Sequence, residues 1–140
     1  MTDVAIVYWS GTGNTEAMAK LVAEGVESAG KTAELISAEN FNASDVGKYS
    51  RLIFGCPSMG DEILEEDVFE PMFESVENSL SGIKIGLFGS YGWGDGQWMR
   101  DWVDRCKEKG AVVAGNVIAN EYPDNTASDE CRSLGSTVAS

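Results

Sequence analysis

The residues best suited to chemistry form one short stretch near the start of the chain, Ser10-Gly11-Thr12-Gly13-Asn14-Thr15. It lies between an apolar, strand-like run at 4–9 and a segment with helical periodicity. Glycines leave backbone N–H groups accessible, and a helix N-terminus adds a partial positive charge. The hydroxyl and amide side chains supply further donors. The stretch therefore predicts a phosphate-binding loop, because an ordinary helix cap needs fewer residues of these types.

Two common nucleotide-binding loops do not fit this stretch. A Walker A loop requires Lys followed by Ser or Thr after its last glycine, and no Lys lies between Thr12 and Met18. A Rossmann fingerprint requires Gly or Ala at the position that Glu16 occupies. The remaining candidate is a loop that holds a single terminal monophosphate.

Two further loops carry residues that the hydrophobic pattern does not explain. Cys56-Pro57-Ser58-Met59-Gly60-Asp61-Glu62 follows a strand expected at 51–56, and Ser90-Tyr91-Gly92-Trp93-Gly94 follows one expected at 83–91. Trp93 lies between two glycines and outside any periodicity. Its large ring either stacks on a flat ligand or folds back onto the core.

The elements that position these loops alternate between the two periodicities. Apolar runs predict five strands, and residues spaced three and four apart predict helices between them. This alternation predicts one α/β domain over 1–140, with a mostly parallel sheet and helices on both faces. Ligands of such sheets bind beyond the carboxyl ends of the strands. The expected strands are 4–9, 32–36, 51–56, 83–91 and 111–119, the last broken near Gly115; the expected helices are 18–29, 68–80, 98–106 and 127–138, with a brief one at 42–46.

The composition excludes several classes of function. The net charge of −13 disfavours nucleic acid and anionic membranes as partners, whereas an acidic surface suits basic proteins, or serves solubility alone. No apolar run is long enough to cross a bilayer, and the N-terminus lacks the features of a signal peptide. The chain has no histidine and three widely spaced cysteines, Cys56, Cys106 and Cys131. We therefore expect no metal site, no disulfide framework and a cytoplasmic location.

Together, the three loops resemble the FMN loops of the short-chain flavodoxins of anaerobic bacteria, and the resemblance spans the whole chain. It implies a flavodoxin-like, doubly wound sheet of five parallel strands in the order 2-1-3-4-5. It also implies a non-covalently bound FMN, with its phosphate on Ser10 to Thr15 and its flavin between Met59 and Trp93. Glu62 would contact the pyrimidine edge near N3, and Gly60-Asp61 would lie beside N5.

The resemblance assigns the other site residues less directly. Ser90 and Asn120 are candidates for contacts to the ribityl chain or ring edge, and Pro57 replaces a small polar residue found in some relatives. No catalytic residue and no metal ligand are expected. The complete expected set of cofactor-binding residues is Ser10, Gly11, Thr12, Gly13, Asn14, Thr15, Pro57, Ser58, Met59, Gly60, Asp61, Glu62, Ser90, Tyr91, Gly92, Trp93, Gly94 and Asn120.

The residues near the flavin imply a redox behaviour. Turning the Gly60-Asp61 peptide would present a carbonyl to the proton that N5 gains, which favours the neutral semiquinone, and glycine makes this turn cheap. No Lys or Arg occurs between Asp61 and Ile83, and acidic residues cluster there. Negative charge disfavours an anionic hydroquinone. The expected function is a low-potential one-electron carrier that shuttles between semiquinone and hydroquinone, a monomer whose redox partners dock transiently on its acidic surface.

Two other functions compete with this interpretation. An FMN-dependent NAD(P)H:quinone reductase shares the fold, but it needs a second nucleotide site, and no basic residues are placed to form one. A phosphorylatable receiver domain needs an Asp after the third strand and a Lys after the last. Cys56-Pro57 and Asn120-Glu121 stand at those positions instead.

Overall fold

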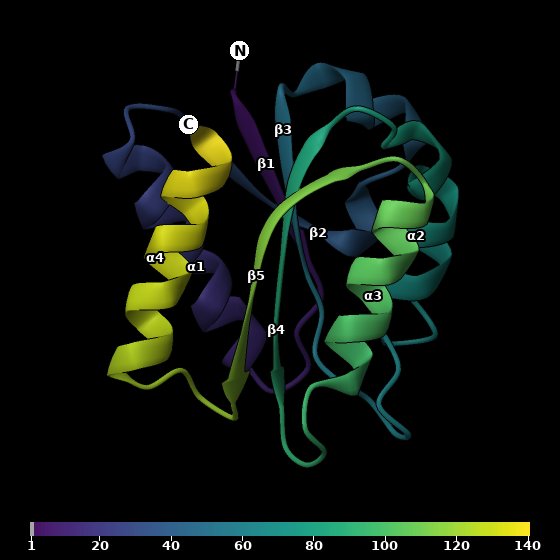
Figure 1. Ribbon diagram of the computed structural model, residues 1–140, viewed down its shortest axis with the longest axis vertical. Helices are drawn as coiled ribbons and strands as arrows, with labels where there is room; N and C mark the ends of the chain where they lie inside the picture. Colours follow the sequence, from purple (N-terminus) through teal and green to yellow (C-terminus); the bar gives the residue numbers. More distant parts are fainter. Residues whose placement is uncertain (1) are drawn as a thin grey trace.

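All five strands of the protein belong to one parallel sheet. The computed structural model describes residues 2–140. The strands are β1 (Val4–Tyr8), β2 (Ala33–Ser37), β3 (Arg51–Gly55), β4 (Lys84–Tyr91) and β5 (Val112–Asn120). They are ordered β2-β1-β3-β4-β5 across the sheet (Figure 1). The doubly wound sheet and the strand order expected from the sequence are confirmed.

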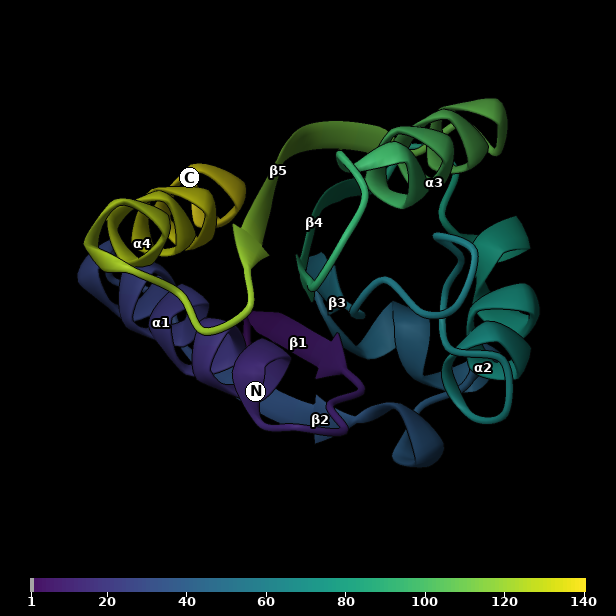
Figure 2. The same cartoon turned by 90° about the horizontal axis from the view of Figure 1, so that it is seen from below.

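Two pairs of helices cover the two faces of this sheet. Helices α1 (Asn14–Ser28) and α4 (Asn125–Ala139) lie on one face, and α2 (Phe69–Val76) and α3 (Gln97–Glu108) lie on the other (Figure 2). Successive strand residues point to opposite faces. Along β1, Ile6 is therefore buried against α1 and α4, and its neighbour Val7 is buried in the core on the side of α2 and α3.

One helix is shorter than the sequence predicts. The sequence predicts a long helix over 68–80, but α2 ends at Val76 and continues only as the 3-10 turn η3 (Glu77–Ser79). Asn78 and Ser79, which belong to residue types that favour turns over helix interiors, follow directly at this point. Two other 3-10 helices, η1 (Ala38–Asn40) and η2 (Ala43–Lys48), connect β2 to β3.

Two finer expectations match the structure. The brief helix expected at 42–46 is η2, where Asn42 Oδ1 accepts a hydrogen bond from the Ser44 N–H at 2.9 Å. The expected break near Gly115 is a register shift between β4 and β5. Ile85 pairs with Val113 and Gly86 pairs with Gly115, so that Ala114 is the extra residue of a bulge.

Helices α1 and α4 approach each other closely because a glycine lies on each. A Cβ atom on Gly25 would collide with the carbonyl group of Arg132, and one on Gly135 would collide with the carbonyl oxygen of Val22. The two backbones are therefore in contact without intervening side chains. Among residues 2–140, no helix has the length and apolar character needed to span a bilayer.

We predict that Gly135→Ala lowers the free energy of unfolding by about 1–3 kcal/mol, although alanine favours helices, because the new methyl group has no space. Denaturant unfolding measures this change. The matched control is Gly47→Ala, since a Cβ atom at Gly47 meets no atom within 4 Å. If both variants unfold at the same denaturant concentration as the wild type, the result would contradict a close backbone contact between α1 and α4 at Gly135.

Candidate functional site

The segment Ser10–Thr15, here called the phosphate loop, connects β1 to the start of α1. It lies where the chain order reverses, since β1 is followed by β2 on one side and has β3 on the other. Gly13 is the N-cap of α1 and has a φ of 96°, which favours glycine. The Ser10 hydroxyl oxygen accepts hydrogen bonds from the N–H groups of Gly13 and Glu16, both at 3.2 Å. Ser10 thereby fixes the curve of the loop.

Several backbone donors of the phosphate loop have no acceptor. Within residues 2–140, the N–H groups of Thr12, Asn14 and Thr15 donate no hydrogen bond, and the N-cap residue Gly13 has no side chain to accept one. Helix N-termini of this kind bind anions. The loop contains no Lys or Arg. An anion at this position would be held by N–H groups and the helix dipole rather than by an ion pair.

A buried pair of hydroxyl groups ties the phosphate loop to the end of β4. Thr15 Oγ1 and Ser90 Oγ are 3.0 Å apart, and both residues are buried. One hydroxyl donates a hydrogen bond to the other, so that both buried groups have a partner. This contact fixes the distance between the first and third of the loops that the sequence analysis singled out.

The three loops enclose a cavity of about 310 Å³ at the carboxyl edge of the sheet. Gly13 instead faces a second cavity, of about 480 Å³, on the side of β2. Glu62, Trp93 and Asn120 are among the expected residues that line neither cavity. Those that line the first are Ser10, Gly11, Thr12, Asn14, Thr15, Pro57, Ser58, Met59, Ser90, Tyr91 and Gly92.

Two lining residues were not expected from the sequence. Trp9 is half-buried and lines both cavities, and a Cβ atom on Gly11 would lie 2.9 Å from its Cη2 atom. Glu121 lines the first cavity, and its backbone has a φ of 57°. Its N–H donates to the Tyr91 carbonyl at 2.8 Å. Both residues follow directly after a strand. That position is the signal that could have identified them.

The loop after β3 ends in a tight turn at Gly60-Asp61-Glu62. Met59 and Ile63 exchange two backbone hydrogen bonds, of 2.8 and 3.0 Å, which close the turn. Gly60 has a φ of 49° and Glu62 a φ of 57°. The left-handed conformation is cheap only for the glycine, so the turn holds Glu62 in an unfavourable geometry.

Hydrogen bonds from the start of α3 account for this geometry of Glu62. The N–H groups of Gly96 and Gln97 donate to Glu62 Oε1, each at 3.2 Å. A Cβ atom on Gly94 would collide with the same carboxylate, so this approach requires glycine. Glu62 Oε2 accepts no hydrogen bond within the described part of the chain. One carboxylate thus joins the loops after β3 and β4 and keeps one oxygen free.

Two large apolar side chains of these loops are exposed. Trp93 is 63% exposed and Met59 is 38% exposed. The alternative in which Trp93 folds back onto the core is therefore wrong for this structure. The side chain of Asn120 contacts the same loop, because its Nδ2 donates to the Tyr91 carbonyl at 3.3 Å. Its amide fixes the end of β5 to the loop after β4.

The acidic stretch after the turn is partly compensated. The buried Glu65 carboxylate caps the start of α2, accepting from the N–H groups of Asp67, Val68 and Phe69 at 2.7–2.8 Å. Arg105 of α3 pairs with Glu70 at 2.7 Å and with Glu77 at 2.8 Å. Its hydrogen bond lowers the pKa of Glu77. No Lys or Arg lies within 61–83, so the compensating cation, Arg105, comes from a segment distant in the sequence.

The cysteines take no part in the site. All three are buried and unpaired. Burial raises the pKa of Cys106 and of Cys131 to about 12, and it also raises that of Cys56. Thiols of this kind are unreactive at neutral pH. Among the described residues, no group of three or more Cys, Asp or Glu side chains is arranged to hold a metal ion.

A loop with unused N–H donors at the switch point of a doubly wound sheet is typical of nucleotide-binding α/β proteins. A model of the flavodoxin family matches residues 6–135. The chain is 49% identical to the flavodoxin of Megasphaera elsdenii over 97% of this chain and 98% of that protein. It is 45% identical to the flavodoxin of Clostridium beijerinckii, over 96% and 97% of the two chains.

The solved structures agree with these sequence matches. The solution structure of two-electron reduced Megasphaera elsdenii flavodoxin has a TM-score of 0.91 and covers 97% of this chain and 98% of that chain. The chain belongs to the flavodoxin family, whose members are FMN-binding electron carriers.

We predict that Glu62→Ala speeds hydrogen exchange at the Gly96 and Gln97 amides, because both lose their acceptor. The cost should be about 0.5–2 kcal/mol, the range for losing a helix cap. Hydrogen exchange followed by NMR measures it. Glu62→Gln is the control, since its side-chain oxygen still accepts these bonds, and its exchange should stay near that of the wild type. Equal exchange in Glu62→Ala and the wild type would show that Glu62 does not join the two loops.

Proposed function

We propose that this chain binds FMN non-covalently and acts as a low-potential one-electron carrier. The observation that carries this proposal is the set of unused N–H donors in the phosphate loop, beside a cavity bordered by the loops after β3 and β4. Family membership supports the choice of FMN among phosphate-bearing ligands.

The phosphate loop suits a terminal phosphate. The free N–H groups of Thr12, Asn14 and Thr15 point to a ligand that only accepts hydrogen bonds, as a phosphate dianion does. The exposed Thr12 hydroxyl is available as a further donor. The lack of a cation leaves the negative charge of the phosphate uncompensated.

The flavin ring would be held by the two exposed side chains and by Glu62. Met59 and Trp93 leave apolar surface in water that a flat ring would cover. Glu62 Oε1 is fixed by α3, so the free Oε2 is available to accept a hydrogen bond from the N3–H of the ring. Glu62 would thus link ring recognition to the geometry of both loops.

FMN supplies the one-electron chemistry when it is bound. The chain contributes the Gly60-Asp61 peptide, whose carbonyl would accept a hydrogen bond from the proton at N5. A Cβ atom on Gly60 would meet nothing within 4 Å, and its φ of 49° is already in the region that glycine enters freely. The glycine is therefore needed for backbone freedom rather than for space.

Electrostatics favour a low potential for the second electron. Asp61, Glu66 and Asp67 are exposed near the turn, and no cation pairs with them within residues 2–140. Arg105 compensates Glu70 and Glu77 only. Uncompensated negative charge raises the energy of an anionic reduced state, and exposure to water weakens this effect.

The same features favour a carrier over the rival reductase. No Lys or Arg lines either cavity beside the phosphate loop, so the phosphates of NAD(P)H would lack cationic partners. We propose a cytoplasmic monomer, without a substrate of its own, that docks transiently on basic redox proteins through its acidic surface.

We predict that the FMN-free protein binds FMN at least about 100-fold more tightly than riboflavin, because riboflavin lacks the phosphate and each lost charged hydrogen bond costs about 1.5–3 kcal/mol. Titration of flavin fluorescence measures both affinities. Thr12→Val should weaken the affinity for FMN roughly tenfold and leave the affinity for riboflavin unchanged.

The control for this titration is Thr126→Val on α4, which lies outside both cavities of the site and should change neither affinity. Equal affinity for FMN and riboflavin would exclude the phosphate loop as the anchor. Steady-state oxidation of NAD(P)H by quinones, catalysed by the purified protein above the rate with free FMN, would favour the reductase instead.

A further inference from the structure

The outer edge of β5 is an unprotected strand edge. Within residues 2–140, β5 pairs only with β4. Edge strands are normally protected by charged residues or proline. Val112–Asn120 contains neither, whereas the opposite edge strand, β2, carries the exposed Glu34. The bulge at Ala114 interrupts only the first part of β5, and the register is regular from Gly115 onward.

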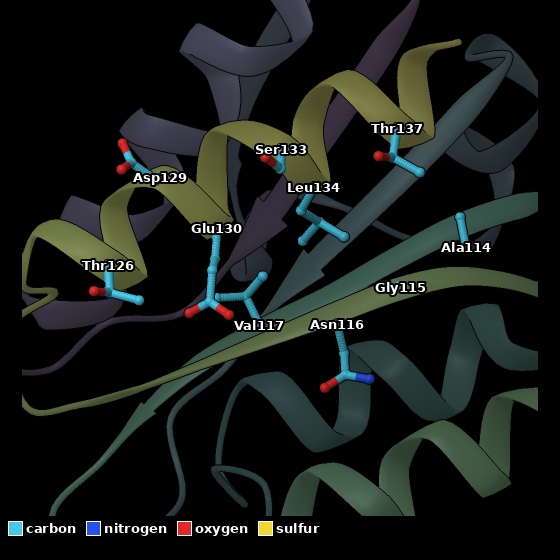
Figure 3. Close-up of a pocket in the computed structure, with 10 residues that line it drawn as sticks. All are labelled: Ala114, Gly115, Asn116, Val117, Thr126, Asp129, Glu130, Ser133, Leu134 and Thr137. Carbon is cyan, nitrogen blue, oxygen red and sulfur yellow. The ribbon is translucent and has the colours of Figure 1, made fainter.

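A groove of about 430 Å³ runs along this edge between β5 and α4 (Figure 3). Its floor is apolar, formed by Ala114, Val117 and Leu134. Gly115 of β5 lines the groove as well, and a Cβ atom at this position would lie 3.4 Å from Leu134 Cδ1. The absence of a side chain at Gly115 therefore leaves space between β5 and α4.

A second groove, of about 410 Å³, follows the other face of the same edge, between β5 and α3. Met99, Val103 and Ile118 give it apolar walls. Asn116 lines both grooves, so the strand edge forms the ridge between them. An extended chain paired with β5 would direct alternate side chains into the two grooves.

The charge around the first groove is negative. Glu130 extends from α4 toward Val117, over the apolar floor (Figure 3). The Glu130 carboxylate has no cationic partner within the described residues. Asp129 stands on the same wall and shares Arg132 with Glu24. An occupant of this groove would need a cation close to Glu130.

We propose that the outer edge of β5 is a docking strand for an extended, cationic segment of a partner protein. Its backbone pairs with Gly115–Ala119, its apolar side chains enter the two grooves, and a Lys or Arg meets Glu130. A second copy of this chain is the poorer occupant, because each copy carries a net charge of −13 and the same acidic wall. None of the expected cofactor residues lines either groove, so this inference does not depend on FMN binding.

The test uses a short peptide of valines with one central lysine, titrated into the purified protein as isolated and followed by backbone amide chemical shifts. We expect shifts at Gly115–Ala119 that saturate. The same peptide with alternate backbone amides N-methylated keeps its charge but cannot pair with the strand. Its binding should be at least tenfold weaker.

Two charge-reversal variants distinguish binding in the groove from non-specific attraction between the cationic peptide and the acidic protein. Glu130→Lys should weaken peptide binding roughly tenfold, whereas Glu74→Lys, at an exposed position on α2, should leave the affinity within about twofold of the wild type. Equal losses in the two variants, or equal binding of the methylated peptide, would overturn the proposal. So would self-association through β5 in sedimentation experiments without peptide, because the occupant would then be a second copy.

Discussion

The unpaired N–H groups at the start of α1 are the interaction on which the rest of the site depends. They lie at the switch point of the sheet, where β1 ends and no neighbouring element provides an acceptor. Ser10 bends the loop, and Gly13 adopts the left-handed conformation that begins the helix. A charged ligand held by amides alone keeps its full charge, because no Lys or Arg is in the loop to neutralise it.

The other two loops are positioned by contacts that cross between elements. The Thr15–Ser90 pair sets the distance from the phosphate loop to the end of β4. Glu62 joins the turn after β3 to the start of α3, and this contact also explains why Gly94 has no side chain. A movement of either loop would therefore be transmitted through Glu62. Met59 and Trp93, by contrast, are exposed and free to cover a ligand.

Much of this arrangement could be predicted from the sequence, because parallel strands bring their carboxyl ends to one edge. The order of strands, the phosphate loop and the convergence of three loops all depend on local periodicity and on that rule. Arg105 could not be found in this way, since its ion pairs join α3 to residues far away in the chain. The apolar run at 4–9 predicts a strand that includes Trp9, whereas β1 ends at Tyr8. The apolar spacing predicts a helix as far as Leu80, whereas α2 ends at Val76 and the turn-forming residues Asn78 and Ser79 follow it.

Stepwise reduction of the FMN-loaded protein with dithionite, followed by visible absorption, tests the central claim most directly. The account predicts a flavin spectrum that passes through a blue, half-reduced form before it bleaches, with the second electron entering at a much lower potential than the first. The blue colour would report the proton held at N5 by the Gly60-Asp61 carbonyl. A protein that takes up no FMN, or one whose spectrum bleaches in a single two-electron step, would contradict the account.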